Sequence, residues 1–207
     1  MIVTVYCSGS IQKGPSDSGK TCWTDAERAA ITRGAHPLDV RFLKPEDPAD
    51  DLANTVALFG RDMYQVQFGD FVVVDARERR GIGIGVEVLA SRVFGTPLVI
   101  VAPPNSYYRL KSLSYRGSTV ANYVHPHLQI LADAIVDDFE QAGAWIRRYI
   151  DTPTKPKGPE ILFRAIEKYR AEMLPTDQPM LVILREMETG GPASRSPQKS
   201  AKRHNRS

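Results

Sequence analysis

The stretch FGRDMYQVQFGDFVVVDARERRGIGIGVEVLASRVFGTP, residues 59–97, decides the fold of this chain. It predicts a helix, a buried strand, a glycine-rich loop and a second helix in succession. The apolar run 71–74 is typical of a strand that is covered on both faces. Glu87 lies where the glycine-rich loop leads into the second helix. The sequence therefore predicts a carboxylate in the crevice at the carboxyl end of a strand, where open α/β sheets bind ligands.

The predicted loop carries glycine at the alternate positions 81, 83 and 85. Without a β-carbon, Gly81, Gly83 and Gly85 would let a ligand approach the backbone closely. We expect these glycines, with Asp75 at the end of the strand, to line a substrate site. Glu87 could act there as a nucleophile or base. It could also be an ordinary carboxylate that stabilises the positive end of the helix dipole.

Strands and helices alternate along the first 150 residues. Thr24 is a suitable N-cap, and Glu27 three residues later completes a capping box. The alternation predicts an α/β fold with a mostly parallel sheet and helices on both faces. Strands are expected over 2–6, 40–43, 71–74 and 98–102, and helices over 25–32, within 52–66, over 86–94 and over 125–149, the last interrupted near Gly143.

The sequence changes character after residue 150. A linker rich in proline and lysine precedes an expected helix at 160–173 and a short apolar segment, read as a strand, at 180–184. Residues 190–207 are rich in glycine, proline, serine and basic side chains, so we expect a disordered basic tail. The predicted organisation is a domain over 1–150, an extension over 151–189 and a tail over 190–207.

Composition narrows the class of protein. The chain has 207 residues, of which 42% are hydrophobic and 25% charged, as expected for one globular α/β domain with additions. Much of the net charge of +3 comes from the tail, which argues against a nucleic-acid groove on the domain. There are two cysteines, no basic and apolar leader, and no apolar run near the ~20 residues of a membrane span. We therefore expect a reduced, cytoplasmic location.

Two short motifs suggest other chemistry. Residues 14–21, GPSDSGKT, match the P-loop pattern for nucleoside triphosphates, and Asp75 resembles the acidic residue that would bind magnesium. However, seven residues separate Tyr6 from Gly14, and the next helix is expected to begin only after Thr24, so its N-terminus would not face a phosphate in this loop. The sequence His125-Pro-His127 could bind a metal, although a loop or a helix start accounts for it more simply.

Several motifs occur in an order that resembles the nucleoside 2-deoxyribosyltransferase superfamily, which includes deoxynucleoside 5′-monophosphate N-glycosidases. These motifs are VYCSGSI at 5–11, GRDMYQV at 60–66, DFVVVDA at 70–76, GIGVE at 83–87 and PPNS at 103–106. The resemblance covers about residues 1–150. It implies a flavodoxin-like, doubly wound fold, no metal or other cofactor, and a homo-oligomer whose subunits complete each other's sites.

The resemblance also implies roles for individual residues. Glu87 matches the glutamate that attacks the anomeric carbon of the sugar. Asp62 matches an aspartate that protonates the leaving base or holds the glutamate, and Tyr6 matches an aromatic residue that orients it. Residues that match substrate-binding positions are Gly9, Ser10 and Ile11, which contact the sugar or its 5′ substituent, and Asn105 or Ser106, which reach into the adjacent subunit's site.

This chain departs from the transferases of the superfamily in ways that favour hydrolysis over base exchange. Transferases carry an acidic residue six positions before the nucleophile, where this chain has Gly81, and their terminal carboxylate has no equivalent here. Basic residues at Lys13, Arg77, Arg79 and Arg80 could accept a 5′-phosphate, or could simply be solvated. The expected activity is cleavage or transfer of the N-glycosidic bond of a nucleoside or nucleotide. The alternatives are a non-catalytic nucleotide-binding module and, more weakly, a P-loop phosphohydrolase.

Overall fold

The computed structural model describes residues 1–11, 22–45, 53–79 and 81–190. The chain divides into two compact units, Met1–Ile161 and Leu162–Ser207. The first unit extends beyond residue 150 because the backbone N–H of Lys157 donates a 2.9 Å hydrogen bond to Asp133. The P-loop-like residues 14–21, Lys13, Arg80 and the tail beyond Gly190 lie outside the described residues.

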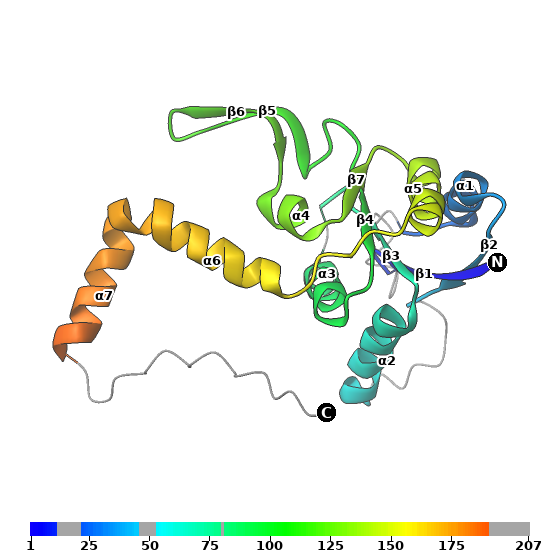
Figure 1. The fold of residues 1–207 in the computed structure, drawn as a ribbon, viewed down its shortest axis with the longest axis horizontal. Coiled ribbons are helices and arrows are strands. Elements are labelled where there is room, and N and C mark those ends of the chain that lie inside the picture. The colour runs from blue at the N-terminus through cyan, green and yellow to red at the C-terminus, as the bar shows by residue number, and fades with distance from the viewer. Residues whose placement is uncertain (12–21, 46–52, 80, 191–207) are drawn as a thin grey trace. The chain divides into compact units, whose positions relative to one another are not determined.

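A parallel sheet forms the centre of the first unit (Figure 1). Its strands are β1 (Ile2–Ser8), β2 (Asp39–Leu43), β3 (Phe71–Asp75), β4 (Leu98–Val101) and β7 (Ala134–Val136). They lie in the order β2-β1-β3-β4-β7, and all four pairings are parallel. This order is consistent with a flavodoxin-like fold, so the expected α/β class with a parallel sheet is confirmed.

Helices cover both faces of this sheet (Figure 1). On one face, α1 (Asp25–Ala35) and α5 (Phe139–Asp151) pack against Val5, Val73 and their neighbours. On the other face, α2 (Thr55–Phe68), α3 (Ile82–Phe94) and α4 (Pro126–Leu131) pack against Val72 and Val74. The expected capping box of α1 is present, because the Thr24 hydroxyl accepts from the backbone of the first turn and Glu27 accepts from the Thr24 backbone N–H.

The glycine-rich segment differs from the expected loop. Helix α3 begins at Ile82, with Gly81 as its N-cap, rather than at Val86. Gly83 and Gly85 therefore lie in the first turn and a half of the helix. Neither has a positive φ, so their backbone conformation does not require glycine. The alternate glycines concealed a helix start because glycine is the poorest helix former after proline.

The single long helix expected over 125–149 is wrong. The structure has α4, then the short strand β7, then α5, and Gly143 lies inside α5 rather than at an interruption. Asp138 lies two residues beyond β7 and caps α5 by accepting a 2.7 Å hydrogen bond from the backbone N–H of Gln141. A strand of three residues is too short to show an alternating pattern, so its apolar residues fitted the helical spacing around them.

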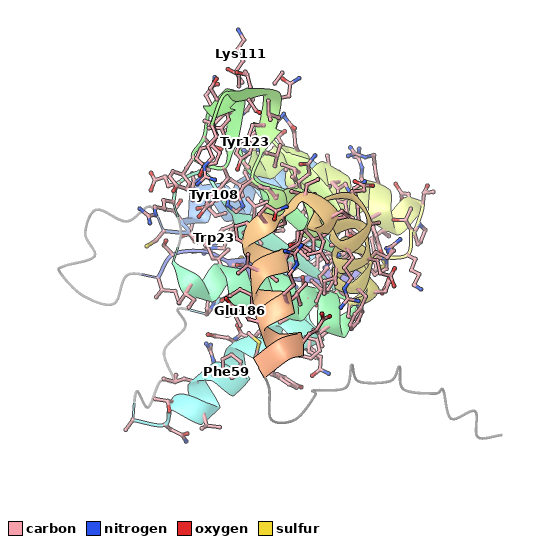
Figure 2. All side chains as sticks on the ribbon, turned by 90° about the vertical axis from the view of Figure 1, so that its left-hand side faces the viewer. Trp23, Phe59, Tyr108, Lys111, Tyr123 and Glu186 are labelled. Carbon is pink, nitrogen blue, oxygen red and sulfur yellow. The ribbon has the colours of Figure 1, made fainter. Side chains whose placement is uncertain are left out.

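A two-stranded hairpin, β5 (Arg109–Tyr115) and β6 (Ser118–Val124), was not expected from the sequence. It turns through Arg116 and Gly117, both of which have positive φ values. Such a turn is the usual connection in a two-residue hairpin. Most side chains of the hairpin are exposed, and Lys111 points away from the domain (Figure 2). Exposure on both faces removes the hydrophobic alternation by which a strand is recognised.

The second unit is helical as far as it is described. Helix α6 (Glu160–Glu172) is followed by a short 3-10 turn, η2 (Leu174–Thr176), and by α7 (Gln178–Gly190). The short strand expected at 180–184 is therefore wrong. Asp177 accepts a hydrogen bond from the backbone N–H of Met180 and so begins a helix there. No helix of the described residues has both the length and the apolar character that a membrane crossing requires.

Two glycines allow α1 and α5 to pack at close range. A β-carbon on Gly34 would lie 1.9 Å from the carbonyl oxygen of Glu140, and one on Gly143 would lie 2.1 Å from the carbonyl oxygen of Ile31. The two helix backbones thus touch directly. Any larger residue at either position would push the helices apart.

We expect Gly143→Ala to destabilise the protein by roughly 1–3 kcal/mol, the usual cost of overpacking a core. The matched control is Gly60→Ala in α2, where a new β-carbon meets nothing within 4 Å. That change should stabilise the protein by about 0.5–1 kcal/mol, because alanine favours a helix over glycine. Urea unfolding of both variants measures the difference. Equal stabilities would contradict the close packing of α1 and α5.

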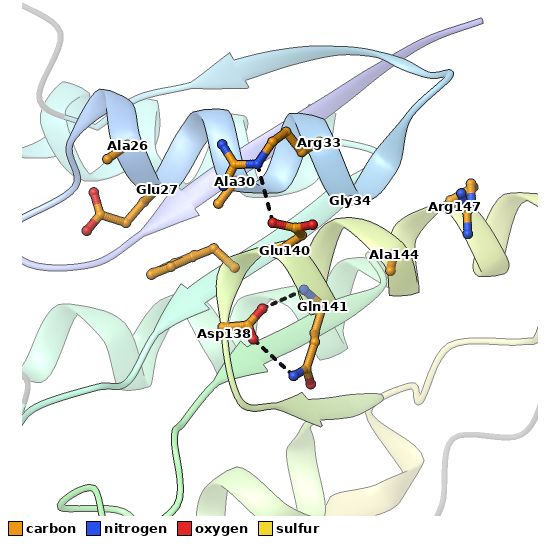
Figure 3. Close-up of a pocket in the computed structure, with 11 residues that line it drawn as sticks. Ala26, Glu27, Ala30, Arg33, Gly34, Asp138, Glu140, Gln141, Ala144 and Arg147 are labelled. Carbon is orange, nitrogen blue, oxygen red and sulfur yellow. Dashed lines mark hydrogen bonds and ion pairs between the residues drawn. The ribbon is translucent and has the colours of Figure 1, made fainter.

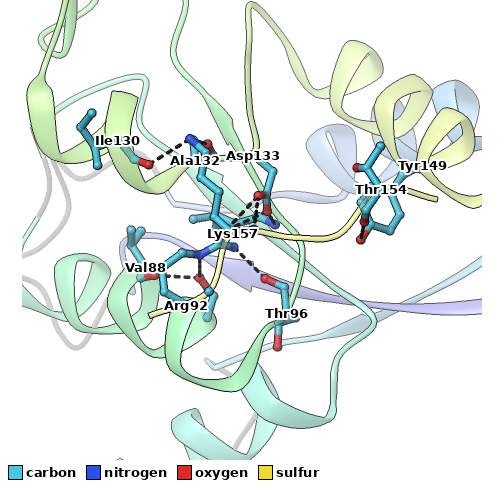
Figure 4. A network of polar contacts seen from close by, with 12 residues as sticks. Val88, Arg92, Thr96, Ile130, Ala132, Asp133, Tyr149, Thr154 and Lys157 are labelled. Carbon is cyan, nitrogen blue, oxygen red and sulfur yellow. Dashed lines mark hydrogen bonds and ion pairs between the residues drawn. The ribbon is translucent and has the colours of Figure 1, made fainter. Parts of the chain in front are cut away.

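A buried ion pair joins α3 to the residue that precedes β7 (Figure 4). The Arg92 side chain is 0% exposed, and its Nη1 lies 3.0 Å from Asp133 Oδ1. Arg92 also donates to the carbonyl oxygen of Thr96. Asp133 accepts further hydrogen bonds from the backbone N–H groups of Leu98 and Lys157. Every charge in this cluster is thus paired, as burial requires.

Removal of one partner should be costly. We expect Asp133→Ala to destabilise the protein by roughly 3–5 kcal/mol, because it leaves the Arg92 guanidinium buried without a counter-charge. Arg33→Ala removes a pair with Glu140 whose side chains are 61% and 58% exposed, and should cost less than about 1 kcal/mol. Thermal unfolding compares the two. A small effect of Asp133→Ala would show that Arg92 finds another partner or reaches water.

Candidate active site

Glu87 is a buried carboxylate on the face of α3 that packs against the sheet. Its exposed fraction is 8%, and it shares this face with Ile84, one helical turn before it, and Ser91, one helical turn after it. Spacings of three and four residues place side chains on the same side of a helix. Packing of the apolar side chains against the sheet therefore also buries Glu87, although burial of a charged group costs free energy.

Two hydroxyl groups of β1 donate hydrogen bonds to the Glu87 carboxylate. The Tyr6 hydroxyl lies 3.0 Å from Oε1, and the Ser8 hydroxyl donates to Oε2. Tyr6 and Ser8 are both 0% exposed. Residues two apart in a strand point to the same face of the sheet, which explains why both side chains reach one carboxylate.

The pKa of Glu87 reflects opposing influences. Burial raises the pKa above its ordinary value, and the negative charge of Asp62 on α2 raises it further, whereas the hydrogen bonds from Ser8 and Tyr6 lower it; the net shift is upward. Burial also raises the pKa of Tyr6, as do the nearby charges of Glu87 and Asp62. Tyr6 therefore stays protonated and acts as a donor. Glu87, Asp62 and Tyr6, the three catalytic candidates of the sequence, lie together.

This cluster lies at the point where the strand order reverses. The chain runs from β1 outward to β2, and then crosses β1 to form β3 on its other side. Ser8 ends β1 and pairs with Val74, next to the end of β3. In open α/β sheets, the crevice at such a point is the usual ligand site. Glu87 thus lies at the position where open α/β sheets usually bind ligands.

Open space surrounds the glycines that precede Glu87. A β-carbon on Gly81 or Gly85 would meet no described atom within 4 Å, and one on Gly83 would lie 4.0 Å from Glu87 Oε1. Among the described residues, no side chain covers the backbone at Gly81 and Gly85, and the predicted approach of a ligand there stays a prediction. Gly9 differs, because a β-carbon there would lie 2.4 Å from Nε1 of Trp23. Packing against Trp23 is sufficient reason for glycine at that position.

Asp75 and Arg77 lie on the other side of the sheet from Glu87. Asp75 is buried, and its two carboxylate oxygens each accept a 3.0 Å hydrogen bond from the Arg77 guanidinium. Arg77 Nη1 also lies 2.9 Å from Glu27 of α1, and its guanidinium covers the ring of Phe139 of α5. The α1 and α5 face thus holds this triad of charges. Its geometry indicates a structural role for Asp75 and Arg77, in place of the substrate contacts predicted for them.

The remaining predicted positions lie on loops at the same end of the sheet. Ser10 and Ile11 follow β1 and are half-buried. Asn105 has a positive φ of 63° and lines a groove of about 460 Å³ at the base of the β5–β6 hairpin. The Ser106 hydroxyl is buried and makes no hydrogen bond among the described residues. None of these residues is brought into contact with Glu87 by a described hydrogen bond.

A larger groove, of about 750 Å³, lies between α1 and α5 (Figure 3). Arg33 and Glu140 form an ion pair across it, and Ala30, Gly34 and Ala144 form part of its wall. These helices cover the opposite face of the sheet from Glu87, so this groove is separate from the candidate site. None of the described residues that line this groove is a nucleophile activated by a neighbouring base.

Metal chemistry finds no support elsewhere in the described part of the chain. No group of three or more His, Cys, Asp or Glu side chains among these residues is arranged to hold a metal ion. His125 stands at the N-cap of α4 and its ring packs edge-to-face against Tyr108 and His127. Burial lowers the pKa of His125, and the charge of His127 adds to this effect.

Ser8 is the site residue that the sequence did not reveal. The strand expected over 2–6 stopped short of Ser8, whereas the observed β1 extends to it, so that Ser8 follows Tyr6 by two positions and shares its face. Ser8 belongs to the motif VYCSGSI, but the resemblance assigned roles only to its neighbours on either side.

No protein-family model and no curated protein matches this sequence. The function of the protein is therefore inferred from the chemistry of the Glu87 cluster.

The two glutamates, Glu87 and Glu27, should respond to pH in opposite ways. A raised carboxyl pKa means that Glu87 stabilises the fold at low pH and that this contribution is lost as the pH rises through its folded-state pKa. Glu87→Gln should therefore stabilise the protein at pH 7, by about 1 kcal/mol, the usual size for one favourable change. The gain should vanish below the ordinary pKa of glutamate, about 4.3.

Glu27→Gln is the matched control. Burial alone would raise the pKa of Glu27, but hydrogen bonds from Thr24 and Arg77 outweigh burial and lower it. Its contribution is therefore present above the ordinary glutamate pKa and lost as the pH falls. Urea unfolding from pH 4 to pH 8 should show Glu27→Gln losing stability, relative to wild type, as the pH rises. If the stability of both variants, relative to wild type, changed in the same direction with pH, this would contradict the raised pKa of Glu87 and the lowered pKa of Glu27.

Proposed function

We propose that this protein cleaves the N-glycosidic bond of a nucleoside or nucleoside 5′-monophosphate, with Glu87 as nucleophile. The observation that carries the proposal is the buried Glu87 carboxylate, held by Tyr6 and Ser8 at the point where the strand order reverses. The motifs that resemble the nucleoside 2-deoxyribosyltransferase superfamily support it. Their matched residues Tyr6, Asp62 and Glu87 come from three separate segments and meet at this point.

The chemistry follows from the charge that develops on the sugar. The bond between C1′ and the base nitrogen breaks through a state with oxocarbenium character, as in glycoside hydrolysis. A Glu87 oxygen bonds to C1′ as the base leaves with the bonding electron pair and takes up a proton. Asp62 is the proposed source of that proton, or else holds Glu87 in place. Water then attacks C1′ and breaks its bond to the Glu87 oxygen, which frees the carboxylate, and the proton that water gives up replaces the one that Asp62 donated.

Water is the proposed acceptor because the base-binding position lacks a carboxylate. Gly81 stands six residues before Glu87, where the transferases of the superfamily carry an acidic residue. Around Gly81 there is open space in place of a side chain. A second nucleobase would find no carboxylate there to orient it. Hydrolysis is thus favoured over base exchange.

The case for a 5′-phosphate depends on which basic residues are free to bind it. The Arg77 guanidinium is already bonded to Asp75 and Glu27, so it is a poor candidate. Arg79 lies with its guanidinium 5.8 Å from the centre of the Tyr107 ring. Such a pair offers a cation and an aromatic face at the start of α3. We place the phosphate or base near Arg79 rather than Arg77.

The outward face of α3 supports the proposed homo-oligomer. Ile82, Val86, Leu89 and Val93 recur at helical spacing and are exposed. Phe59 of the neighbouring α2 is exposed as well (Figure 2). A helix that is apolar on all sides is normally buried on all sides. A second subunit against this face would lie beside the helix that carries Glu87.

One observation favours a second function, that of a non-catalytic nucleotide-binding module. Burial raises the pKa of Glu87, and a protonated carboxyl group donates a hydrogen bond rather than attacking a sugar. Such a group would bind a base or sugar in the same crevice without chemistry. The P-loop alternative is weakened, since Asp75, its proposed magnesium ligand, is bonded to Arg77.

The test is a panel of ribonucleosides, deoxynucleosides and their 5′-monophosphates, with release of free base followed by chromatography. We expect release from at least one substrate, and a loss of about a thousandfold or more in Glu87→Gln, as for other removed nucleophiles. Glu27→Gln, on the other face of the sheet, should keep the activity. Binding of a substrate without base release would favour the binding module. Magnesium-dependent phosphate release that survives Glu87→Gln would favour the P-loop alternative.

A further inference from the structure

Both oxygens of the Glu87 carboxylate are held from a single strand. The Tyr6 hydroxyl donates to Oε1 and the Ser8 hydroxyl donates to Oε2. A terminal carboxylate rotates easily about its last bond, because the preference at such a bond is broad. One donor leaves that rotation free to a large extent, whereas two donors on different oxygens fix the plane of the group.

The backbone that carries Ser8 is itself firmly placed. Ser8 pairs with Val74 of β3 at the end of the sheet. Its carbonyl oxygen accepts a 3.1 Å hydrogen bond from Nε1 of Trp23. The Trp23 ring can approach in this way because Gly9, the next residue, has no β-carbon. The serine hydroxyl therefore starts from a fixed main chain and has one free torsion with which to find Glu87.

We propose that Ser8 is a positioning residue for Glu87, whose hydroxyl holds Oε2 and, together with Tyr6, fixes the plane of the carboxylate toward the crevice. The sugar-attack role of that carboxylate rests on the proposed function, but the contact itself does not. When one oxygen bonds to C1′, the other becomes the carbonyl oxygen of the ester. A carbonyl oxygen still accepts a hydrogen bond, so one hydroxyl keeps its partner through the step.

The hydroxyl also opposes the effect of burial. A donor to a carboxylate favours its charged form, so the Ser8 bond lowers the pKa that burial and Asp62 raise. The two titratable groups that act on Glu87 are Tyr6 of β1 and Asp62 of α2. Neither is changed by a substitution at Ser8. Loss of the Ser8 hydroxyl should therefore move the titration of Glu87 upward, whereas a purely structural role for Ser8 would leave it in place.

Ser91→Ala is the matched control for Ser8→Ala. Ser91 is also 0% exposed, and it belongs to the same helix as Glu87. Its hydroxyl donates to the carbonyl oxygen of Val88, at 2.7 Å, and not to the carboxylate. The two variants thus remove the same atom from equally buried sites. Only one of them removes a donor to Glu87.

The experiment is a carbon-13 NMR titration of the glutamate carboxyl groups in the full chain, with the Glu87 signal assigned by its absence from Glu87→Gln. We expect the midpoint of Glu87 to rise by about one pH unit in Ser8→Ala and to stay unchanged in Ser91→Ala. Ser8→Cys, which keeps a weak donor, should give an intermediate midpoint and serves if the alanine variant does not fold. An unchanged midpoint in the Ser8 variants would overturn the proposal.

Base release by the same variants separates this proposal from the proposed function. If the enzyme is an N-glycosidase, kcat of Ser8→Ala should fall about tenfold or more, because the attacking carboxylate is no longer held in one orientation, and the pH at which the rate becomes half-maximal should follow the Glu87 midpoint. A shifted midpoint without base release in any variant, wild type included, would support the contact and overturn the glycosidase. A normal kcat in Ser8→Ala with an active wild type would overturn the positioning role.

Discussion

The central strand β3 is buried along its whole length, and the architecture follows from this. Alternate side chains of Phe71–Asp75 point to opposite faces, so each face must be covered by helices. Val72 and Val74 require α2 and α3 on one side, while Phe71 and Val73 require α1 and α5 on the other. Because the five strands of this sheet are parallel, their carboxyl ends lie along one edge. The same constraint that closes the core therefore brings together the carboxyl ends of β1 and β3, where open α/β sheets usually bind ligands.

The two polar clusters at this edge stabilise a buried carboxylate in different ways. On the α1 and α5 face, Asp75 is matched by Arg77, and the charges neutralise each other. On the α2 and α3 face, Glu87 is given hydroxyl donors and a neighbouring acid but no described salt bridge to a cation. A paired carboxylate is stable and chemically quiet, whereas an unneutralised one is costly and reactive. This contrast separates structural from functional carboxylates more clearly than their spacing in the sequence does.

The sequence predicted what depends on local patterns. The valine run of β3, the capping box at Thr24 and the order of motifs placed Tyr6, Asp62 and Glu87 correctly on β1, α2 and α3. It failed where tertiary contacts decide. The strand β7 is defined by pairing with β4 rather than by its three residues, and the face of the sheet to which Asp75 belongs could not be separated from that of Glu87. Two carboxylates at the ends of neighbouring elements resemble each other in sequence, although the sheet lies between them.

The contact of Trp23 with the Ser8 carbonyl has a spectroscopic consequence. The chain contains only two tryptophans, Trp23 and Trp145, and Trp145 packs against Phe71 and Tyr149 on the α5 face. The Trp23 indole thus hydrogen-bonds to the residue whose hydroxyl donates to the Glu87 carboxylate. We expect its fluorescence emission to respond to changes at this carboxylate, and Trp145 supplies an internal reference within the same molecule.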